Sequence, residues 1–251
     1  MLRGVPRLLV IDISNSFTKF AIAHRGRLGR VHRLPTRELT AKNFTAAARQ
    51  MRFDATALSS VVPARTAAIR RAVGAPILEI DHRAPLGIGI DYPDPASIGA
   101  DRLANAVACA ALHGAPAIVV DFGTAVTFDV ISKSGDYIGG VIAPGLNAMT
   151  DYLHTRTALL PRVEISEPRR AVGKSTREAM LSGAVHGYRG LITEIVRQVS
   201  REAFAGRKPK IVATGGDAAL IARKLPLFTA VDPLLTLHGV RIVGERAFGA
   251  A

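Results

Sequence analysis

Two stretches of the chain share one pattern of hydrophobic and polar positions. Each begins with a run of aliphatic residues, reaches an aspartate, turns on small or polar residues and returns through alternating apolar positions. The stretches are LLVIDISNSFTKFAIA at residues 8–23 and IVVDFGTAVTFDVIS at residues 118–132. An apolar run predicts a buried strand, and alternation after it predicts a returning strand with one buried face. Each stretch is therefore predicted to form a strand, a tight turn and a strand, with an acid ending the first strand.

The two stretches also align position by position. Asp12 falls on Asp121, and the pairs that follow at equal offsets are Ser14 with Gly123, Asn15 with Thr124, Thr18 with Thr127, and Ile22 with Ile131. A repeat of this size indicates the architecture of the whole chain. We predict a duplicated α/β fold with two similar halves, residues 1–114 and 115–251. A central cleft between such halves would suit a polyphosphate and its cations.

The rest of the chain is predicted to alternate helices and strands, which is typical of an α/β fold. Helical spacing occurs at residues 40–51, 65–73, 97–113, 147–159, 175–204, 217–225 and 235–248, and short strands are predicted at 57–62, 76–80, 137–142 and 210–213. Residues 81–96 contain several Gly and Pro and predict a stiff loop. The long helix opens with a capping-box pattern at Ser175 and Glu178. Small residues along this helix predict close packing against another helix: Gly183, Ala184, Gly187 and Gly190.

The composition indicates an anionic partner. The formal net charge is +13 and the pI is about 10.8. The basic residues are scattered and Trp is absent, so we do not expect nucleic acid to be the partner. No stretch reaches the ~18 apolar residues of a membrane helix. The single cysteine, Cys109, excludes a disulfide framework and favours a reducing cytoplasm, and the apolar run after Arg7 lacks a signal-peptide pattern.

The paired turns predict a site for phosphate groups. Phosphoryl transfer requires positioned phosphates, neutralising cations and an oriented nucleophile. Turns of Gly, Ser, Thr and Asn present N–H groups and hydroxyls to phosphate, and an acid at a strand end can hold a cation. One such turn is usually structural, whereas two in register favour a phosphate site. Residues 214–216, Thr-Gly-Gly, fit either an adenosine site or a plain helix-start turn.

Asp101 is the candidate general base, because it is an acid at a predicted helix start beside the stiff loop. The alternative is that Asp101 only offsets the helix dipole. Arg102 fits either bidentate binding of an acidic substrate or a surface salt bridge. Thr176 fits either a helix cap or a substrate donor, and Tyr92 fits simple packing of the loop. The His residues show no metal-binding spacing.

Six motifs, in their order along the chain, resemble those of type III pantothenate kinases. They are DISNS at residues 12–16, GADR at 99–102, DFGT at 121–124, GGVIAPG at 139–145, GKST at 173–176 and TGG at 214–216. The resemblance implies a duplicated actin-like (ribonuclease H-like) ATPase fold of the sugar-kinase superfamily. It also implies phosphorylation of pantothenate by ATP, the first step of coenzyme A synthesis, and a homodimer with the substrate site near the subunit interface.

The resemblance further implies a role for each matching residue. Asp101 would be the general base, and Asp121 would coordinate a monovalent cation, K⁺ or NH₄⁺, in addition to the Mg²⁺ of ATP. The phosphate-binding residues would be Thr124 and the first loop, namely Asp12, Ile13, Ser14, Asn15, Ser16, Phe17, Thr18 and Lys19. The pantothenate-binding residues would be Tyr92, Gly99, Ala100, Asp101, Arg102 and Thr176.

Ser14 departs from the family pattern, which usually has Gly at this position of the first loop. If the position needs a positive φ, Ser14 would be strained by about 1 kcal/mol or more. If it needs only a small residue, Ser14 can serve and adds a hydroxyl donor. Two alternatives to a pantothenate kinase are a non-catalytic regulator resembling Bvg accessory factors and a kinase of the same fold with another small hydroxy acid as acceptor.

Overall fold

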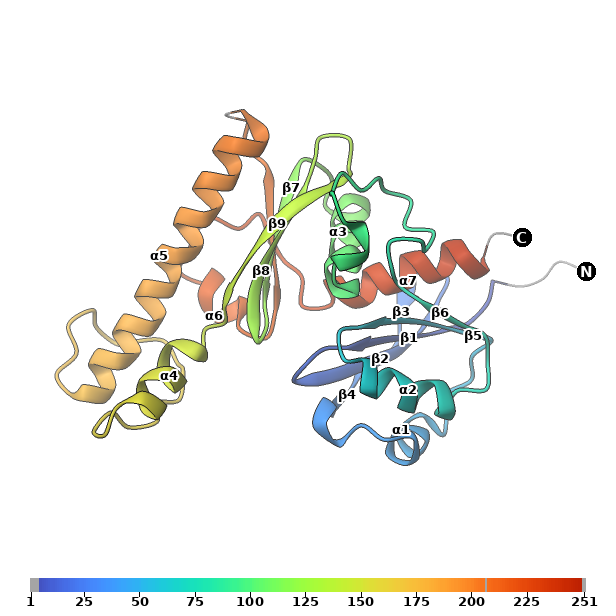
Figure 1. The fold of residues 1–251 in the computed structure, drawn as a ribbon, viewed down its shortest axis with the longest axis horizontal. Coiled ribbons are helices and arrows are strands. Elements are labelled where there is room, and N and C mark those ends of the chain that lie inside the picture. Colours follow the sequence, from blue (N-terminus) through green and yellow to red (C-terminus); the bar gives the residue numbers. More distant parts are fainter. Residues whose placement is uncertain (1–4, 206, 250–251) are drawn as a thin grey trace, which may run out of the picture. The chain divides into compact units, whose positions relative to one another are not determined.

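The fold is described from a computed structural model, which covers residues 5–205 and 207–249. The described chain divides into two compact units. Unit 1 contains the chain up to Leu112, the short segment Gly135–Ile138 and the C-terminal segment from Leu234. Unit 2 contains His113–Ser134 and Gly139–Pro233. Each unit is built on one mixed β-sheet (Figure 1).

The sheet of unit 1 begins with the predicted strand, turn and strand. Its strands are β1 (Leu8–Ile13), β2 (Phe17–His24), β3 (Arg27–Leu28), β4 (His32–Pro35), β5 (Ala55–Ser60) and β6 (Ile77–Glu79). The order is β3-β2-β1-β5-β6, and β4 also pairs with β2. Strand β2 is antiparallel to β1, whereas β5 runs parallel to it. The prediction for residues 8–23 is confirmed.

Helices cover both faces of this sheet (Figure 1). They are α1 (Ala41–Ala48), α2 (Pro63–Ala72), α3 (Ala100–Leu112) and α7 (Leu235–Phe248), with short 3₁₀ turns η1 (Thr36–Glu38) and η2 (Pro95–Ser97). On the face of α1 and α2, Phe44 and Ile69 pack with alternate strand residues such as Ile11. On the other face, a Cβ on Gly244 of α7 would lie 2.8 Å from Ala57 Cβ. Close contact of helix and sheet there depends on glycine.

The sheet of unit 2 repeats the same topology. Its strands are β7 (Ala117–Phe122), β8 (Ala125–Ile131), β9 (Tyr137–Pro144), β10 (Lys210–Gly215) and β11 (Ala230–Val231), and its helices are α4 (Ala148–Arg156), α5 (Thr176–Phe204) and α6 (Ala218–Ala222). The order β11-β10-β7-β8-β9 mirrors β6-β5-β1-β2-β4. In both sheets the first strand pairs antiparallel with the next strand and parallel with a later one. The predicted duplication is therefore visible in the strand order.

The compact units differ from the predicted halves, 1–114 and 115–251, at the C-terminal helix. Helix α7 belongs to unit 1 because its small residues fit closely against that unit. A Cβ on Gly239 would lie 1.9 Å from the carbonyl oxygen of Ala104, so α7 and α3 pack at a distance that only glycine permits. The segment Gly135–Ile138 also clusters with unit 1.

Several element boundaries also differ from the prediction. The helix predicted to start at residue 97 starts at Ala100, because Pro95 opens a separate 3₁₀ turn and Ile98 is extended with ψ 127°. The helix at residues 40–51 is shorter and is capped by Thr40, whose side chain accepts from Asn43 N. Helix α7 has the predicted bounds. Across residues 5–205 and 207–249, no helix combines the length and hydrophobicity needed to cross a bilayer.

Candidate functional site

The first acid-bearing turn connects β1 to β2. Asp12 is buried, and the turn closes with a hydrogen bond of 3.2 Å from Ser14 N to Phe17 O. The hydroxyl of Thr36, which lies outside the turn in the sequence, donates to the Ser14 carbonyl over 2.7 Å and stabilises the turn. Asn15 and Ser16 stand exposed at its tip. The tip of this loop is therefore the part that faces solvent.

Ser14 occupies its position without backbone strain. Among the described residues, the only non-glycine residues with positive φ are Arg25 and Ala205. The Ser14 hydroxyl donates to Asp12 Oδ2 over 2.9 Å. The second alternative considered for Ser14 is thus the correct one, because the position accepts a small residue and the hydroxyl bonds to the acid of the same turn.

Asp12 has two neighbours on adjacent strands. Lys19 pairs with it across β2, and Ser59 pairs with it across β5. Paired residues of neighbouring strands point to the same face of a sheet, so the three side chains share one face. Ser59 is fully buried, and its hydroxyl has no hydrogen-bond partner in the described part of the chain. Sequence reasoning missed Ser59, although it ends an apolar run, as Asp12 does.

The end of β5 also reaches the start of α3, where Asp101 lies. A Cβ on Gly99 would lie 3.7 Å from Val61 Cγ1 and 2.7 Å from Asp101 Oδ1. The amide of Val61 in turn donates to Ile13 O over 3.1 Å. Unit 1 therefore brings the ends of β1 and β5 and the start of α3 together, and with them the candidate phosphate loop and the candidate base.

Burial dominates the electrostatics of Asp101. It raises the pKa of this carboxyl above the ordinary value, and the backbone N–H and positive charge of Arg102 only partly lower it. Asp101 Oδ1 accepts from Arg102 N over 2.8 Å, and this bond holds the carboxyl at the first turn of the helix. A half-buried carboxyl with a raised pKa in a helix start is suited to accept a proton.

Arg102 and Tyr92 both lie beside Tyr137, in unit 1. The Arg102 guanidinium carbon is 5.7 Å from the centroid of the Tyr137 ring, which suits a cation–π contact. The Tyr92 and Tyr137 rings meet edge to face with centroids 6.1 Å apart. Tyr92 thus packs against Tyr137, on the ring that also lies beside Arg102. The sequence predicts a strand at Tyr137, but nothing in the sequence indicates that Tyr137 belongs to the candidate site.

The second acid-bearing turn, in unit 2, is enclosed by two glycines. Asp121 lies near the end of β7, and Gly123 N donates to Ala125 O over 3.1 Å. A Cβ on Gly145 would lie 2.4 Å from Thr124 O, and a Cβ on Gly215 would lie 2.5 Å from Asp121 Oδ1. Gly215 also has a φ of +92°. The motifs at residues 139–145 and 214–216 therefore both pack on this turn.

Thr214 pairs with Asp121 across β10 and β7, as Ser59 pairs with Asp12 in unit 1. Gly216 is exposed, and Asp217 is the N-cap residue of the short helix α6. Burial raises the pKa of Asp217. The segment 214–217 thus follows β10 directly beside the second turn, an arrangement that fits an adenosine site as well as a helix start.

Thr176 is the first residue of α5 and is exposed. The cap is Ser175, whose hydroxyl accepts from Glu178 N over 3.2 Å, so the capping alternative for Thr176 is wrong. Glu178 in return accepts from Lys174 N over 2.7 Å. Gly173 fits closely under this helix start, because a Cβ there would lie 2.3 Å from Ala179 N.

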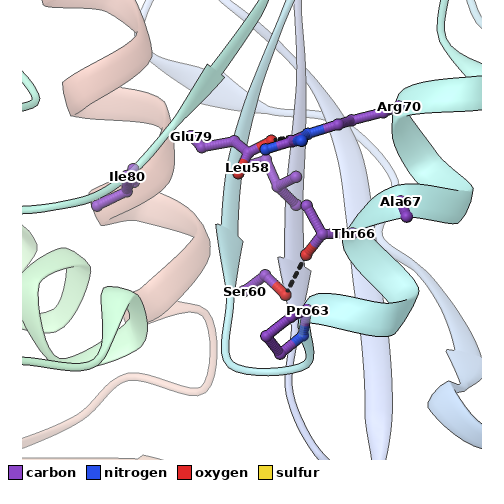
Figure 2. A pocket seen from close by; sticks show the side chains of 8 residues that line it. All are labelled: Leu58, Ser60, Pro63, Thr66, Ala67, Arg70, Glu79 and Ile80. Carbon is purple, nitrogen blue, oxygen red and sulfur yellow. Dashed lines mark hydrogen bonds and ion pairs between the residues drawn. The ribbon is translucent and has the colours of Figure 1, made fainter.

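A pocket of about 250 Å³ lies on the α2 side of the unit 1 sheet (Figure 2). Its lining residues are Leu58, Ser60, Pro63, Thr66, Ala67, Arg70, Glu79 and Ile80. The Thr66 hydroxyl donates to Ser60 Oγ over 2.8 Å, and Arg70 forms an ion pair with Glu79. Strand alternation points Ser60 away from the face of Ser59, so this pocket is separate from the predicted site.

The described residues contain no group of three or more His, Cys, Asp or Glu side chains that could hold a metal ion. In proteins Mg²⁺ commonly takes several of its ligands from substrate phosphates and water. The carboxylate of Asp121, near the end of β7, is a hard oxygen ligand of the kind that such cations prefer.

Comparison with known proteins adds independent information. A family model described as type III pantothenate kinase matches residues 8–198. The type III pantothenate kinase of Akkermansia muciniphila is 50% identical over 235 residues, which cover 93% of this chain and 96% of that protein. The type III pantothenate kinase of Methylacidiphilum infernorum is 43% identical over 238 residues, which cover 95% of this chain and 88% of that protein.

Solved structures support the fold. A Campylobacter jejuni protein assigned to the Baf family of transcriptional activators matches with a TM-score of 0.64 at 21% identity, over 95% of this chain and 98% of that chain. A Listeria monocytogenes protein assigned as an N-acetylmannosamine kinase matches with a TM-score of 0.59 at 10% identity, over 96% and 99%. The predicted duplicated actin-like fold is confirmed. The chain belongs to the type III pantothenate kinase family.

Proposed function

We propose that this protein transfers the γ-phosphoryl group of ATP to the primary hydroxyl of pantothenate, the first step of coenzyme A biosynthesis. The observation that carries the proposal is Asp101, a half-buried carboxyl of raised pKa at the start of α3. Gly99, two residues before it, lies against Val61 at the end of β5, beside the strand that carries Asp12. A proton acceptor and a phosphate loop on neighbouring strand ends are what a small-molecule kinase requires.

Asp101 accepts the proton of the pantothenate hydroxyl as that oxygen attacks the γ-phosphorus, and the bond from the γ-phosphorus to the bridging oxygen breaks to release ADP. Burial keeps the carboxylate basic, and its bond from Arg102 N fixes its direction. The guanidinium of Arg102 binds the carboxylate of pantothenate. Pantothenate carries its reacting hydroxyl and its carboxylate at opposite ends. Because the Arg102 side chain is long, Arg102 reaches the carboxylate while its neighbour Asp101 contacts the hydroxyl. Gly99, Ala100, Tyr92 and Thr176 complete the substrate contacts.

The turn of each unit serves the phosphates of ATP. The first loop, residues 12–19, offers the exposed groups of Asn15 and Ser16, and Lys19 supplies positive charge beside Asp12. In the second turn Thr124 is exposed, and we assign it to phosphate as well. Asp121 holds K⁺ or NH₄⁺, while Mg²⁺ is bound mainly by ATP itself. These cations, when bound, offset the negative charge of the phosphates during transfer.

The protein acts as a homodimer in this proposal. Large apolar side chains of unit 2 are exposed on β9, α4 and the connector that follows, namely Ile142, Tyr152, Leu159 and Val172. Gly183, Gly187 and Gly190 lie on an exposed stripe of α5, where an added Cβ would meet nothing within 4 Å. Such an open stripe allows a second helix to approach closely. Sedimentation equilibrium showing only monomer at micromolar concentration would contradict the dimer.

Product analysis tests the proposed reaction against a different acceptor. Purified protein is incubated with Mg-ATP and with pantothenate, pantoate or glycerate in turn, and products are identified by mass spectrometry. We expect 4′-phosphopantothenate as the main product, with the other two acids phosphorylated far more slowly. Faster phosphorylation of another acid would keep the kinase chemistry but change the acceptor.

A further inference from the structure

Residues 136 and 137 form a short bridge to the loop that carries Tyr92. Tyr137 N donates to Gly89 O over 3.0 Å, and Asp91 N donates to Tyr137 O over 2.8 Å. The Asp136 carboxylate accepts from Gly89 N over 2.7 Å. Three hydrogen bonds therefore fix the backbone on both sides of Tyr137 against residues 89–91.

The contact between this bridge and the loop is too close to admit a side chain at Gly89. A Cβ there would lie 2.6 Å from Asp136 Oδ1. The glycine also has no positive φ, so its lack of a side chain matters for space. The register of the bridge against the loop is therefore set by packing as well as by hydrogen bonds.

Tyr137 is fully buried, and its ring contacts two residues assigned to pantothenate. The ring lies 5.7 Å from the Arg102 guanidinium carbon and 6.1 Å from the Tyr92 ring. Arginine has several rotatable bonds, and an aromatic neighbour restricts where its planar guanidinium points. In the sequence Tyr137 is far from both residues, at the start of β9.

We propose that Tyr137 is a positioning residue for substrate recognition, which orients Arg102 toward the carboxylate of pantothenate and holds Tyr92 beside it. The inference rests on the proposed function, in which Arg102 binds that carboxylate. Tyr137 acts through the face of its ring. Its loss therefore weakens discrimination between a substrate that has the carboxylate and one that lacks it.

The test compares pantothenate with pantothenol, in which a hydroxymethyl group replaces the carboxylate and the reacting hydroxyl is unchanged. The measured quantity is the ratio of kcat/KM for the two substrates, determined on one enzyme preparation. This ratio does not depend on the fraction of folded enzyme, because that fraction cancels. We expect Tyr137→Leu to lower the ratio about three- to tenfold, the range of a partly buried cation–π contact.

Two control variants separate positioning from stability. Tyr137→Phe keeps the ring and should keep the ratio of the unchanged protein. Tyr188→Leu removes another fully buried tyrosine, which packs on Phe122 in unit 2, and should lower stability without changing the ratio. A fall in the ratio with Tyr188→Leu as large as with Tyr137→Leu would overturn the inference.

Arg102→Gln distinguishes failure of the inference from failure of the proposed function. If Arg102→Gln lowers the ratio and Tyr137→Leu leaves it unchanged, the inference is overturned and the role of Arg102 stands. If Arg102→Gln leaves the ratio unchanged, the assignment of Arg102 fails and the inference fails with it. Should Tyr137→Leu not fold, Gly89→Ala displaces the same bridge, and an unchanged ratio in that variant overturns the inference.

Discussion

Asp101 has the opposite of the pKa shift that its position alone would predict. A carboxyl in the first turn of a helix is ordinarily more acidic, because the helix dipole favours its charged form. Here burial has the larger effect and raises the pKa, although Arg102 opposes it. The residue that motif resemblance assigns as the base is therefore more basic than an ordinary aspartate, which favours its accepting a proton.

Replacing Asp101 with Asn should lower kcat about 10²- to 10⁴-fold, the usual contribution of a general base, with ATP binding retained. Because burial raises the pKa of Asp101, kcat/KM of the unchanged enzyme should fall on the acid side at a pH above the ordinary range of aspartate. Steady-state rates across pH measure both effects. Asp94→Asn, an exposed acid nearby, is the control; full turnover of Asp101→Asn would remove the base assignment.

Ser14 should tolerate glycine, because its backbone has no positive φ. We expect Ser14→Gly to change kcat/KM for ATP by less than about threefold and to lower stability by up to about 1 kcal/mol through the greater freedom of glycine. Ser14→Ala is the paired variant, which removes the bond to Asp12 without adding freedom. A rise of more than about tenfold in kcat/KM for ATP in the Ser14→Gly variant would mean that serine impairs ATP binding by the loop.

The turn between β7 and β8 depends on distant segments for its shape. Gly145, which follows β9, donates its N–H to Thr124 O over 3.2 Å, and a side chain there would collide with that oxygen. Gly215, at the end of β10, approaches Asp121 in the same way. Two segments far along the chain thus fix the geometry of one turn.

Gly145→Ala should therefore displace the second turn. The added methyl would lie 2.4 Å from Thr124 O, and overpacking of this kind costs about 1–3 kcal/mol. We expect a lower melting temperature and a raised KM for ATP. Gly74→Ala is the matched control, because a Cβ there meets nothing within 4 Å. Equal behaviour of the two variants would show that the turn does not depend on Gly145.

Glu167 lies in the connector between α4 and α5 and binds it to α5 and to the end of α6 through ion pairs. It accepts two hydrogen bonds from Arg189, at 3.0 and 2.8 Å, and lies within 3.4 Å of Arg223 and 3.2 Å of Lys224. Bonding to Arg189, more than to the other two cations, lowers the pKa of Glu167 from 4.5 to about 2. The connector leads to Thr176, so this cluster also supports the start of α5.

Glu167→Gln should lower the free energy of unfolding at neutral pH by about 1–3 kcal/mol, because it weakens charged hydrogen bonds of the buried Arg189. The pKa of Glu167 is lower in the folded state. Its contribution is therefore complete above pH 4.5 and declines as pH falls toward 2. Urea unfolding between pH 7 and 3 should show a shallower decline in the variant.

Glu194→Gln is the matched control for this cluster. Its pKa is also lowered to about 2, chiefly by a hydrogen bond from Arg197, but this pair is exposed on α5. Solvent screens an exposed pair, so we expect little change in stability. If the two variants change the free energy of unfolding equally, the ion pairs of Glu167 stabilise the fold no more than an exposed pair does.

On the scale of the whole molecule, the repeated pattern predicted the architecture because it is local. Each acid-bearing turn and its two strands follow from apolar runs and alternation within about sixteen residues. The parallel partners β5 and β10 then follow from the order of strands and helices. Of the candidate site, the two turns could be predicted in this way, whereas the start of α3 is predicted at residue 97 and lies at Ala100.

Long-range packing could not be predicted from these patterns. The apolar face of α7 predicts a buried helix, but it does not predict which unit the helix packs against. The close packing of Gly239 against Ala104 is visible only in the structure. Tyr137 resembles any buried strand residue, yet it packs beside Arg102. Ser59 forms part of the site face because β5 pairs with β1 in one particular register.

We propose that this protein is a pantothenate kinase whose second turn holds a monovalent cation. The most direct measurement is the rate of ADP release from Mg-ATP, with and without pantothenate, in potassium and in sodium buffer. We predict release that requires pantothenate and is much faster in potassium, and that Asp121→Asn abolishes the difference between the buffers. Folded protein that releases no ADP with pantothenate in either buffer would contradict the account.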